Sequence, residues 1–376
     1  MREPCGWLIH FNERKKNVGI LTSDPGSFRD TRLMADIQVQ PESLAEVLAY
    51  YCKDGEKLLT LAADLLKFAE RVVVTGMGAS LYAAVGLELE LSRLGIPSSL
   101  RETAELLHYQ DRLREGTFFL VVSRSGETVE VVKLANKIRA EGCSLIAVTN
   151  RPTSSLATLA DLVLPVPSRP EGEMAIQSYT STVLALILLA SRIRGDLEES
   201  YRVLEPLVIG LPGYFARMLK EAPRWDDFFD ARLPVYFLAR GPSSGSAAEA
   251  AMLWNETAKH PAFAMTAGNF RHGHIELVDQ AFRAVTFASG GRTRALNIGL
   301  AEKILSFGGK AAVIGAGGVE SGVALSIATL PVSETFAPLV EIVPIQLAAA
   351  RLAALKGLPV GALRHAQPVT RDEIAF

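Results

Sequence analysis

The chain of 376 residues is too long for one ordinary domain core, so two domains or two fused repeats are expected. A hydrophobic content of 49%, a charged content of 21% and a formal net charge of -2 are typical of a soluble globular protein, and they exclude the strongly basic surface that binds nucleic acid. The longest apolar run, 183–190, is much shorter than the ~20 residues that cross a bilayer and predicts a buried helix.

The first 36 residues show neither helical nor strand periodicity, and turn formers are frequent among them, so we interpret them as an extension outside the core. No apolar segment with a small-residue cleavage site is evident there, which argues against a signal peptide. Cys5, Cys52 and Cys143 are too scattered for a disulfide framework or a CxxC metal site. We therefore expect a cytoplasmic protein without metal or cofactor.

The first half of the chain alternates between short apolar runs and amphipathic segments. Valine-rich residues 71–75 predict a strand that runs into a glycine turn and a helix at 81–94. Residues 117–142 read as strand, loop and helix, two further strands follow at 144–150 and 161–167, and a helix at 176–194 closes this half. Continuous β-branched runs between helices favour an α/β fold, in which a parallel sheet is covered on both faces.

The second half repeats this order after a mixed linker at 211–229. Residues 233–258 match 71–90, residues 282–309 match 117–142, and residues 310–318 match 144–150. An internal duplication of one doubly wound unit follows from these matches. The expected organisation is an extension at 1–36, a first domain at 37–205, a second domain at 206–358 and a tail at 359–376 that closes over the site.

The segment VVSRSGETVEVV, at 121–132, places three hydroxyl groups where a predicted strand passes into a helix. In parallel sheets, ligands bind at the carboxyl ends of strands, next to the free N–H groups of the following helix. Ser123, Ser125 and Thr128 add hydroxyl donors, and Gly126 lets the backbone approach a ligand closely. The pattern predicts a site for a phosphate monoester.

Gly78, Ala79 and Ser80 end the preceding strand and could complete this phosphate site. The alternative is that the serines and the threonine are helix caps and turn formers, which is their most frequent role. Three hydroxyls in six residues, with another serine on the neighbouring strand, favour the phosphate site. Neither the dinucleotide fingerprint nor the GxxxxGK[ST] motif is present.

A second cluster lies at 249–279. Glu249 and Glu256 are seven residues apart on one predicted helix with apolar neighbours, where burial of a carboxylate raises its pKa toward that of a general base. For Glu249 an ion pair on the helix face is at least as good an explanation, so Glu256 is the preferred candidate. His272, in a glycine loop, could carry protons at neutral pH, whereas His274 lacks the third ligand of a metal site.

Together these motifs resemble the sugar isomerase (SIS) domain family, specifically the tandem-SIS isomerase half of the glutamine:fructose-6-phosphate aminotransferases, from about residue 37 to the C-terminus. SRSGET at 123–128 resembles the family's SxSGET phosphate loop, with Arg124 in place of a glutamine. GAS at 78–80 resembles its GTS loop, HG at 272–273 its HGP motif, and 341–361 its VPLQLL segment.

The resemblance implies two SIS domains in tandem, each with a five-stranded parallel sheet. It implies that Glu256 moves a proton between C1 and C2 of a sugar phosphate and that His272 opens the sugar ring. In the family this histidine comes from the neighbouring subunit, which implies a homodimer with sites at the subunit interface. The phosphate-binding set is Ser80, Ser123, Arg124, Ser125, Gly126 and Thr128, and the other substrate-binding residues are Gly78, Ala79, Gln177, Ser178 and Gln367.

The chain also departs from the family pattern. Gln367 stands where the aminotransferases have an imine-forming lysine, Gln177 and Ser178 lie in place of the first residues of their ASTK motif, and no glutaminase motif precedes the similar part. A substrate that brings its own nitrogen needs neither the lysine nor the glutaminase. We therefore expect an aminosugar-phosphate deaminase or a fructosamine-6-phosphate deglycase. The alternatives are a plain aldose–ketose isomerase and a non-catalytic sugar-phosphate sensor, although no basic recognition helix is visible.

Overall fold

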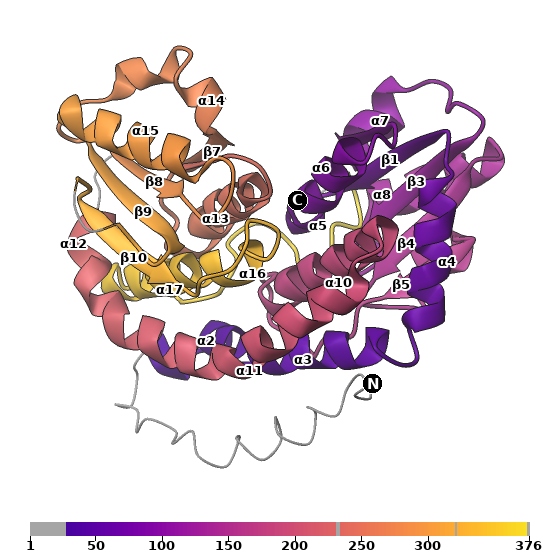
Figure 1. Cartoon of the computed structure of the whole chain (residues 1–376), viewed down its shortest axis with the longest axis horizontal. Coiled ribbons are helices and arrows are strands. Elements are labelled where there is room, and N and C mark those ends of the chain that lie inside the picture. The colour runs from indigo at the N-terminus through magenta and orange to yellow at the C-terminus, as the bar shows by residue number, and fades with distance from the viewer. Residues whose placement is uncertain (1–27, 231–233, 320–321, 374–376) are drawn as a thin grey trace. The chain divides into compact units, whose positions relative to one another are not determined.

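The computed structural model describes residues 28–230, 234–319 and 322–373, which fall into two compact units (Figure 1). Unit 1 contains Val39–Pro212 and the tail from Arg364, and unit 2 contains Gly213–Leu363 and the segment that ends at Gln38. Each unit has one five-stranded parallel sheet covered by helices. The predicted α/β class with two repeated units is confirmed.

Unit 1 is built on a sheet with the strand order β2-β1-β3-β4-β5. Valine and other apolar side chains fill its central strands, which are buried on both faces, as parallel strands usually are. Its strands are β1 (Arg71–Gly76), β2 (Ser98–Glu102), β3 (Thr117–Val122), β4 (Ser144–Thr149) and β5 (Leu162–Pro165). Its helices are α3 (Gln40–Tyr51), α4 (Glu56–Lys67), α5 (Ala79–Ala83), α6 (Val85–Arg93), α7 (Thr103–Tyr109), α8 (Val129–Ala140), α9 (Ser155–Leu159) and α10 (Gln177–Arg194).

Unit 2 repeats the same arrangement, with the strand order β10-β9-β8-β6-β7. Its strands are β6 (Val235–Ala239), β7 (Ala262–Thr266), β8 (Arg283–Phe287), β9 (Lys310–Ala316) and β10 (Leu325–Thr329). The helices after the first strand are α13 (Ser243–Ala258), α14 (Ala267–Phe270), η4 (His274–Leu277), α15 (Arg294–Ser306), α16 (Pro338–Glu341) and α17 (Val343–Leu355). The order of strands along the chain therefore maps one sheet onto the other, as the duplication predicts.

Two segments that we expected to be irregular are helical. Residues 1–27 of the expected extension lie outside the described residues, but η2 (Phe28–Asp30) and α2 (Arg32–Gln38) belong to unit 2. Leu33, Met34 and Ile37 are buried, and α2 packs on α17. The interpretation of this stretch as irregular and outside the core is therefore wrong. Three apolar residues at helical spacing are enough to form a buried helix face when α17 covers them.

The expected linker at 211–229 is helical as well. It consists of the end of α11 (Leu197–Glu221), then η3 (Ala222–Trp225) and α12 (Asp226–Phe229). The limit between the two units falls inside α11, after Pro212. The mixed composition that suggested a linker reflects an amphipathic helix with one face buried and one exposed.

The most apolar helices are core helices. The run 183–190 lies in α10, nearly all of whose residues are buried, as predicted. The stretch Pro338–Leu355 is long and apolar enough to cross a membrane by length and composition, but 83% of it is buried within the folded chain. Burial to this extent is what a helix at the centre of an α/β unit shows.

Both sheets contain a topological switch point. From β1 the chain goes to β2 on one side of the sheet and to β3 on the other, and β6 is placed in the same way between β7 and β8. In open parallel sheets, ligands bind at such a switch point, outside the carboxyl ends of the strands. The fold therefore offers one candidate site in each unit, after β1 and β3 and after β6 and β8.

The close approach of β8 and β9 in unit 2 gives a stability prediction. A Cβ atom at Gly315 would overlap the backbone carbonyl of Ala288, whereas a Cβ atom at Gly299, exposed on α15, would meet no atom within 4 Å. We expect Gly315→Ala to lower the free energy of unfolding by about 2–3 kcal/mol. Gly299→Ala, the matched control, should raise it by about 0.5–1 kcal/mol. Urea denaturation checks both values, and an unchanged Gly315→Ala midpoint would contradict the packing.

Candidate functional site

The candidate site of unit 1 lies where β1 and β3 end. These strands are parallel neighbours, and Gly76 at the end of β1 pairs with Val122 at the end of β3. The following residues, 77–80 and 123–128, therefore leave the sheet next to each other. Gly78 adopts φ 50°, a conformation that favours glycine, and Ala79 and Ser80 begin α5 directly after it.

Two hydroxyls of the loop 123–128 are oriented by the backbone of the same loop. The Gly126 N–H donates to Ser123 Oγ at 3.1 Å, and the Glu127 N–H donates to Ser125 Oγ at 3.2 Å. Both serines are buried, with 4% and 6% of their surface exposed. Each hydroxyl accepts a bond and, within the part of the chain that the structure describes, has no acceptor for its own proton. These protons are available to a ligand with oxygen acceptors.

Gly126 and Glu127 fix the course of this loop. Gly126 has φ 63°, and a Cβ atom there would overlap the side chain of Ser154, so no other residue fits without rearrangement. The carboxylate of Glu127 accepts from the N–H and from the hydroxyl of Ser155, both at 2.8 Å, at the start of α9. The N–H and then the hydroxyl of Ser155 hold the pKa of Glu127 below its usual range. Glu127 thus ties the loop to α9, a role that the sequence analysis missed.

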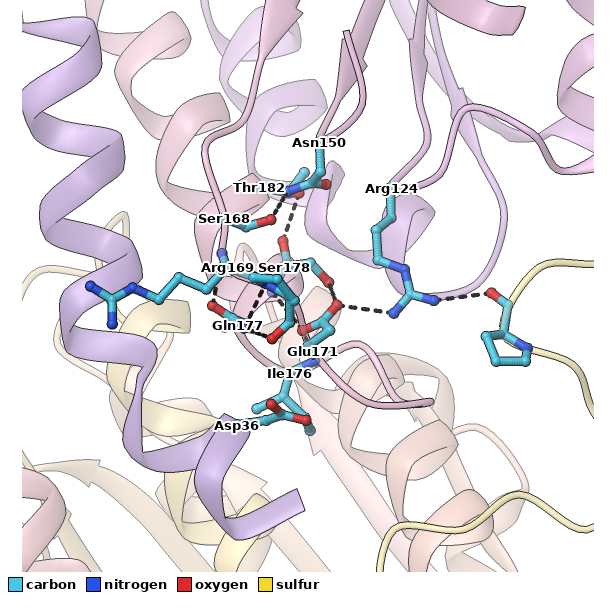
Figure 2. A network of polar contacts seen from close by, with 12 residues as sticks. Asp36, Arg124, Asn150, Ser168, Arg169, Glu171, Ile176, Gln177, Ser178 and Thr182 are labelled. Carbon is cyan, nitrogen blue, oxygen red and sulfur yellow. Dashed lines mark hydrogen bonds and ion pairs between the residues drawn. The ribbon is translucent and has the colours of Figure 1, made fainter. Parts of the chain in front are cut away.

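Arg124, expected to bind phosphate, lies in an ion pair (Figure 2). Its Nη1 is 2.9 Å from Oε1 of Glu171, whose side chain is only 6% exposed. The other oxygen of Glu171 accepts from the N–H groups of Ile176 at 3.2 Å and Ser178 at 3.1 Å, at the start of α10. The carboxylate of Glu171 thus interacts both with the positive end of the α10 helix dipole and with the guanidinium group of Arg124. Glu171 was not predicted, because it lies five residues before the N-cap of α10, outside the positions where capping residues are expected.

The tail also reaches this loop within unit 1. Arg124 Nη2 donates to the carbonyl of Pro368 at 3.0 Å, and the N–H of Val129, the first residue of α8, donates to the carbonyl of Thr370 at 3.0 Å. Glu373 then pairs with Lys133 of α8 at 3.0 Å. The exposed Gln367 directly precedes these contacts. The structure therefore brings the predicted tail residue beside the predicted phosphate loop.

Gln177 and Ser178 are buried, with 0% and 3% of their surface exposed. The Gln177 amide donates to the carbonyl of Arg169 at 3.0 Å, and its oxygen accepts from the Arg169 N–H at 3.3 Å and contacts the Ser43 hydroxyl. The Ser178 hydroxyl contacts Glu171 (Figure 2). Both side chains hold the segment 169–171, which contains Glu171, the ion-pair partner of Arg124.

The two catalytic candidates lie in unit 2. Glu256 is half-buried in the last turn of α13, and the neighbouring Asn255 exchanges hydrogen bonds of 2.8 and 3.2 Å with Ala262, where β7 begins. His272 is exposed, and it follows α14 beyond the other end of β7. From Ala262 to Thr266 the strand takes four steps, which is about 13 Å. Glu256 therefore lies near the start of β7, and His272 follows the turn of α14 beyond its end.

Glu249 lies on the buried face of α13. Only 1% of its surface is exposed, so it is a core residue of the helix and not part of an exposed face. Among the residues that the structure describes, no group of three or more histidine, cysteine, aspartate or glutamate side chains could hold a metal ion. His274 accordingly has no metal-binding partners there.

Comparison with known proteins places both units in one family. The SIS domain model matches residues 65–192 of unit 1 and 227–356 of unit 2. A glutamine–fructose-6-phosphate aminotransferase (isomerizing) from Bradyrhizobium diazoefficiens is 27% identical over 96% of this chain and 62% of its own length. The chain thus spans less than two thirds of that relative.

Solved structures show the same fold. The C-terminal domain of glucosamine-fructose-6-phosphate aminotransferase from Francisella tularensis superposes with a TM-score of 0.77 at 21% identity, covering 91% of this chain and 99% of that one. A glucosamine-6-phosphate deaminase from Thermotoga maritima has a TM-score of 0.74 at 22% identity, covering 90% and 99%. The resemblance inferred from the motifs is confirmed.

The clamp between Glu127 and Ser155 predicts a pH dependence of stability. Because the pKa of Glu127 is lowered in the folded state, its contribution is fully present above the unfolded pKa, about 4.3, and is lost as pH falls through the folded pKa. We expect wild type to be more stable than Glu127→Gln near neutral pH and the difference to shrink as pH falls below about 4. Urea denaturation at a series of pH values measures it, and a difference that stays constant down to pH 3 would contradict the clamp.

Proposed function

The chain belongs to the SIS domain family, and from this premise we propose that it is an enzyme acting at C1 and C2 of a hexose 6-phosphate derivative. The observation that carries the proposal is the loop 123–128 at the switch point of unit 1. There the buried hydroxyls of Ser123 and Ser125 are positioned by backbone N–H groups, and within the described residues nothing accepts their protons.

A phosphate monoester suits this loop for three reasons. The oxygens of an ionised phosphate can only accept hydrogen bonds. The loop 123–128 presents donors, among them the half-buried hydroxyl of Thr128, and the neighbouring Ser80 adds another. The first residues of α8 add the positive end of a twelve-residue helix. Arg124 adds further N–H donors, since Glu171 and Pro368 engage only part of the five N–H donors of its guanidinium group.

In the proposed reaction Glu256 moves a proton between C1 and C2. Its carboxylate removes the proton beside a carbonyl, an enediol or enolamine forms, and the same carboxyl returns the proton to the neighbouring carbon. His272 assists opening of the sugar ring. Because one copy of unit 2 holds these side chains at opposite ends of β7, a site that uses both requires a second copy of the chain, which supports the homodimer.

The residue at position 367 favours a substrate that already carries nitrogen. Gln367 has a neutral amide, which cannot form an imine with a ketose as a lysine amine can. With an amino group at C1 or C2 of the substrate, the proton shift converts the C–N single bond into an imine. Water then hydrolyses the imine and releases an amine and a hexose phosphate. We therefore propose a deaminase or a deglycase, with the tail from residue 359 covering the site.

The thiols support the expected compartment. Cys52 and Cys143 are both free in the structure, and Cys143 is buried. Reduced thiols are typical of cytoplasmic proteins. We propose a cytoplasmic location on this ground.

A substrate panel tests the proposed reaction. Glucosamine 6-phosphate and fructosamine 6-phosphates are offered to the wild-type enzyme, and hexose phosphate and released amine are measured. We expect both products, and we expect Glu256→Gln to lower kcat/KM by roughly 10²–10⁴-fold while ligand binding is kept. Aldose–ketose exchange without amine would indicate the plain isomerase, and binding without any turnover by the wild type would indicate a sensor.

The phosphate loop is tested separately by Ser123→Ala. Loss of a hydrogen bond to a charged phosphate should weaken binding of the active substrate by about 1.5–3 kcal/mol, seen as a higher KM. The control is Thr60→Ala, which removes an exposed hydroxyl on α4 that donates to the carbonyl of Glu56, and it should leave KM unchanged. Equal KM values for wild type and Ser123→Ala would contradict the assignment of the loop.

A further inference from the structure

The switch point of unit 2 has the same construction as that of unit 1. Gly241 follows β6 with φ 61°, as Gly78 follows β1 with φ 50°, and Ser243 and Ser80 lie two residues after these glycines. Another serine, Ser289, lies in the loop after β8. Hydroxyls are therefore present at the switch point of unit 2 as well, beside the helix that follows the first strand.

In unit 2 this position is occupied by a carboxyl group of the chain itself. The side chain of Glu341, the last residue of α16, is fully buried. Its Oε2 accepts from the Ser289 hydroxyl at 2.5 Å and from the Ser243 hydroxyl at 3.1 Å. Ser243 is the first residue of α13, a helix of 16 residues. The carboxyl thus lies at the end of β8 and at the start of α13, where a bound anion would lie.

The surroundings of this carboxyl contain further polar atoms. Oε1 of Glu341 and the hydroxyl of the fully buried Ser246, one turn along α13, have no hydrogen-bond partner of good geometry in the described part of the chain. Burial raises the pKa of Glu341, and the hydroxyls of Ser289, Ser246 and Ser243 oppose that rise. An anion site provides several hydroxyl donors that point to one buried position. The hydroxyls around Glu341 have this arrangement, and polar atoms without a partner of good geometry lie beside them.

A second carboxylate from the same segment covers the neighbouring part of the loop. The backbone N–H of Arg292 donates to Oε2 of Glu334 at 3.2 Å, and Gly291, with φ 141°, leaves the space that the Glu334 side chain fills. The guanidinium of Arg294 is bound to the carbonyls of Ala316 and Gly318. The segment 334–341 therefore supplies two carboxyl groups that contact this loop.

We propose that the carboxyl group of Glu341 is the resident occupant of a duplicated anion site, so that unit 2 binds no phosphate ligand. The proposal extends beyond the enzyme activity and does not depend on it. If it is correct, removal of this carboxyl leaves a site for a small carboxylate of the same shape, because Glu341→Ala deletes the atoms of one acetate ion.

The test measures thermal stability of Glu341→Ala with acetate and with chloride at equal ionic strength. We expect a lower Tm than wild type and a rise of about 2–4 °C when acetate reaches roughly five times its dissociation constant. Wild type and Glu341→Gln, in which the space stays filled, should show no difference between the two salts. Equal Tm values of Glu341→Ala in acetate and chloride would overturn the proposal.

A second measurement does not require the alanine variant to fold. Equilibrium dialysis of the wild type against labelled inorganic phosphate should show at most one phosphate per chain, and Ser123→Ala with Ser125→Ala should remove it. Phosphate binding that survives this double substitution and is lost in Ser289→Ala would show that unit 2 is open, and it would overturn the proposal. Absence of turnover in the substrate panel affects the enzyme assignment alone.

Discussion

The register between β1 and β3 is the constraint on which the candidate site of unit 1 depends. Because Gly76 and Val122 end neighbouring parallel strands, the two loops that follow them must share one edge of the sheet. The helices that start there direct their N–H groups to the same edge. The register of the strands, and not a contact between side chains, therefore brings the hydroxyls of these loops to one edge of the sheet. The duplication repeats this geometry after β6 and β8.

The two units use this shared geometry in different ways. In unit 1 the hydroxyls of Ser123 and Ser125 are positioned by backbone donors, and the carboxylates of Glu127 and Glu171 are engaged by Ser155 and by Arg124. In unit 2 the carboxyl of Glu341 accepts hydrogen bonds from the hydroxyls of Ser289 and Ser243. Under the two proposals above, the first position binds an external ligand and the second is filled by the chain itself, although the two backbones are alike.

Local patterns in the sequence were sufficient for the sheets, the duplication and the hydroxyl-bearing loop at the end of β3, because valine-rich runs, glycine turns and hydroxyl clusters act within a few residues. They were insufficient for Glu171, which meets Arg124 from 47 positions away, and for Glu341, which meets Ser243 from 98 positions away. No spacing rule connects such residues, since their contact is created by packing of complete elements. The helix α2 was missed for the same reason, because its few apolar residues are buried only by packing on α17, which lies far away in the sequence.

The strand β7 acts as a rigid spacer between Glu256 and His272. Neither side chain is long enough to bridge the ~13 Å of extended backbone between them, and a strand paired to β6 cannot shorten. If the proposed reaction uses both groups, it is tied to the proposed self-association. In that case dilution alone would extinguish turnover in fully folded molecules, and a substitution that weakens the contact between subunits would resemble, in an activity assay, damage to the catalytic groups themselves.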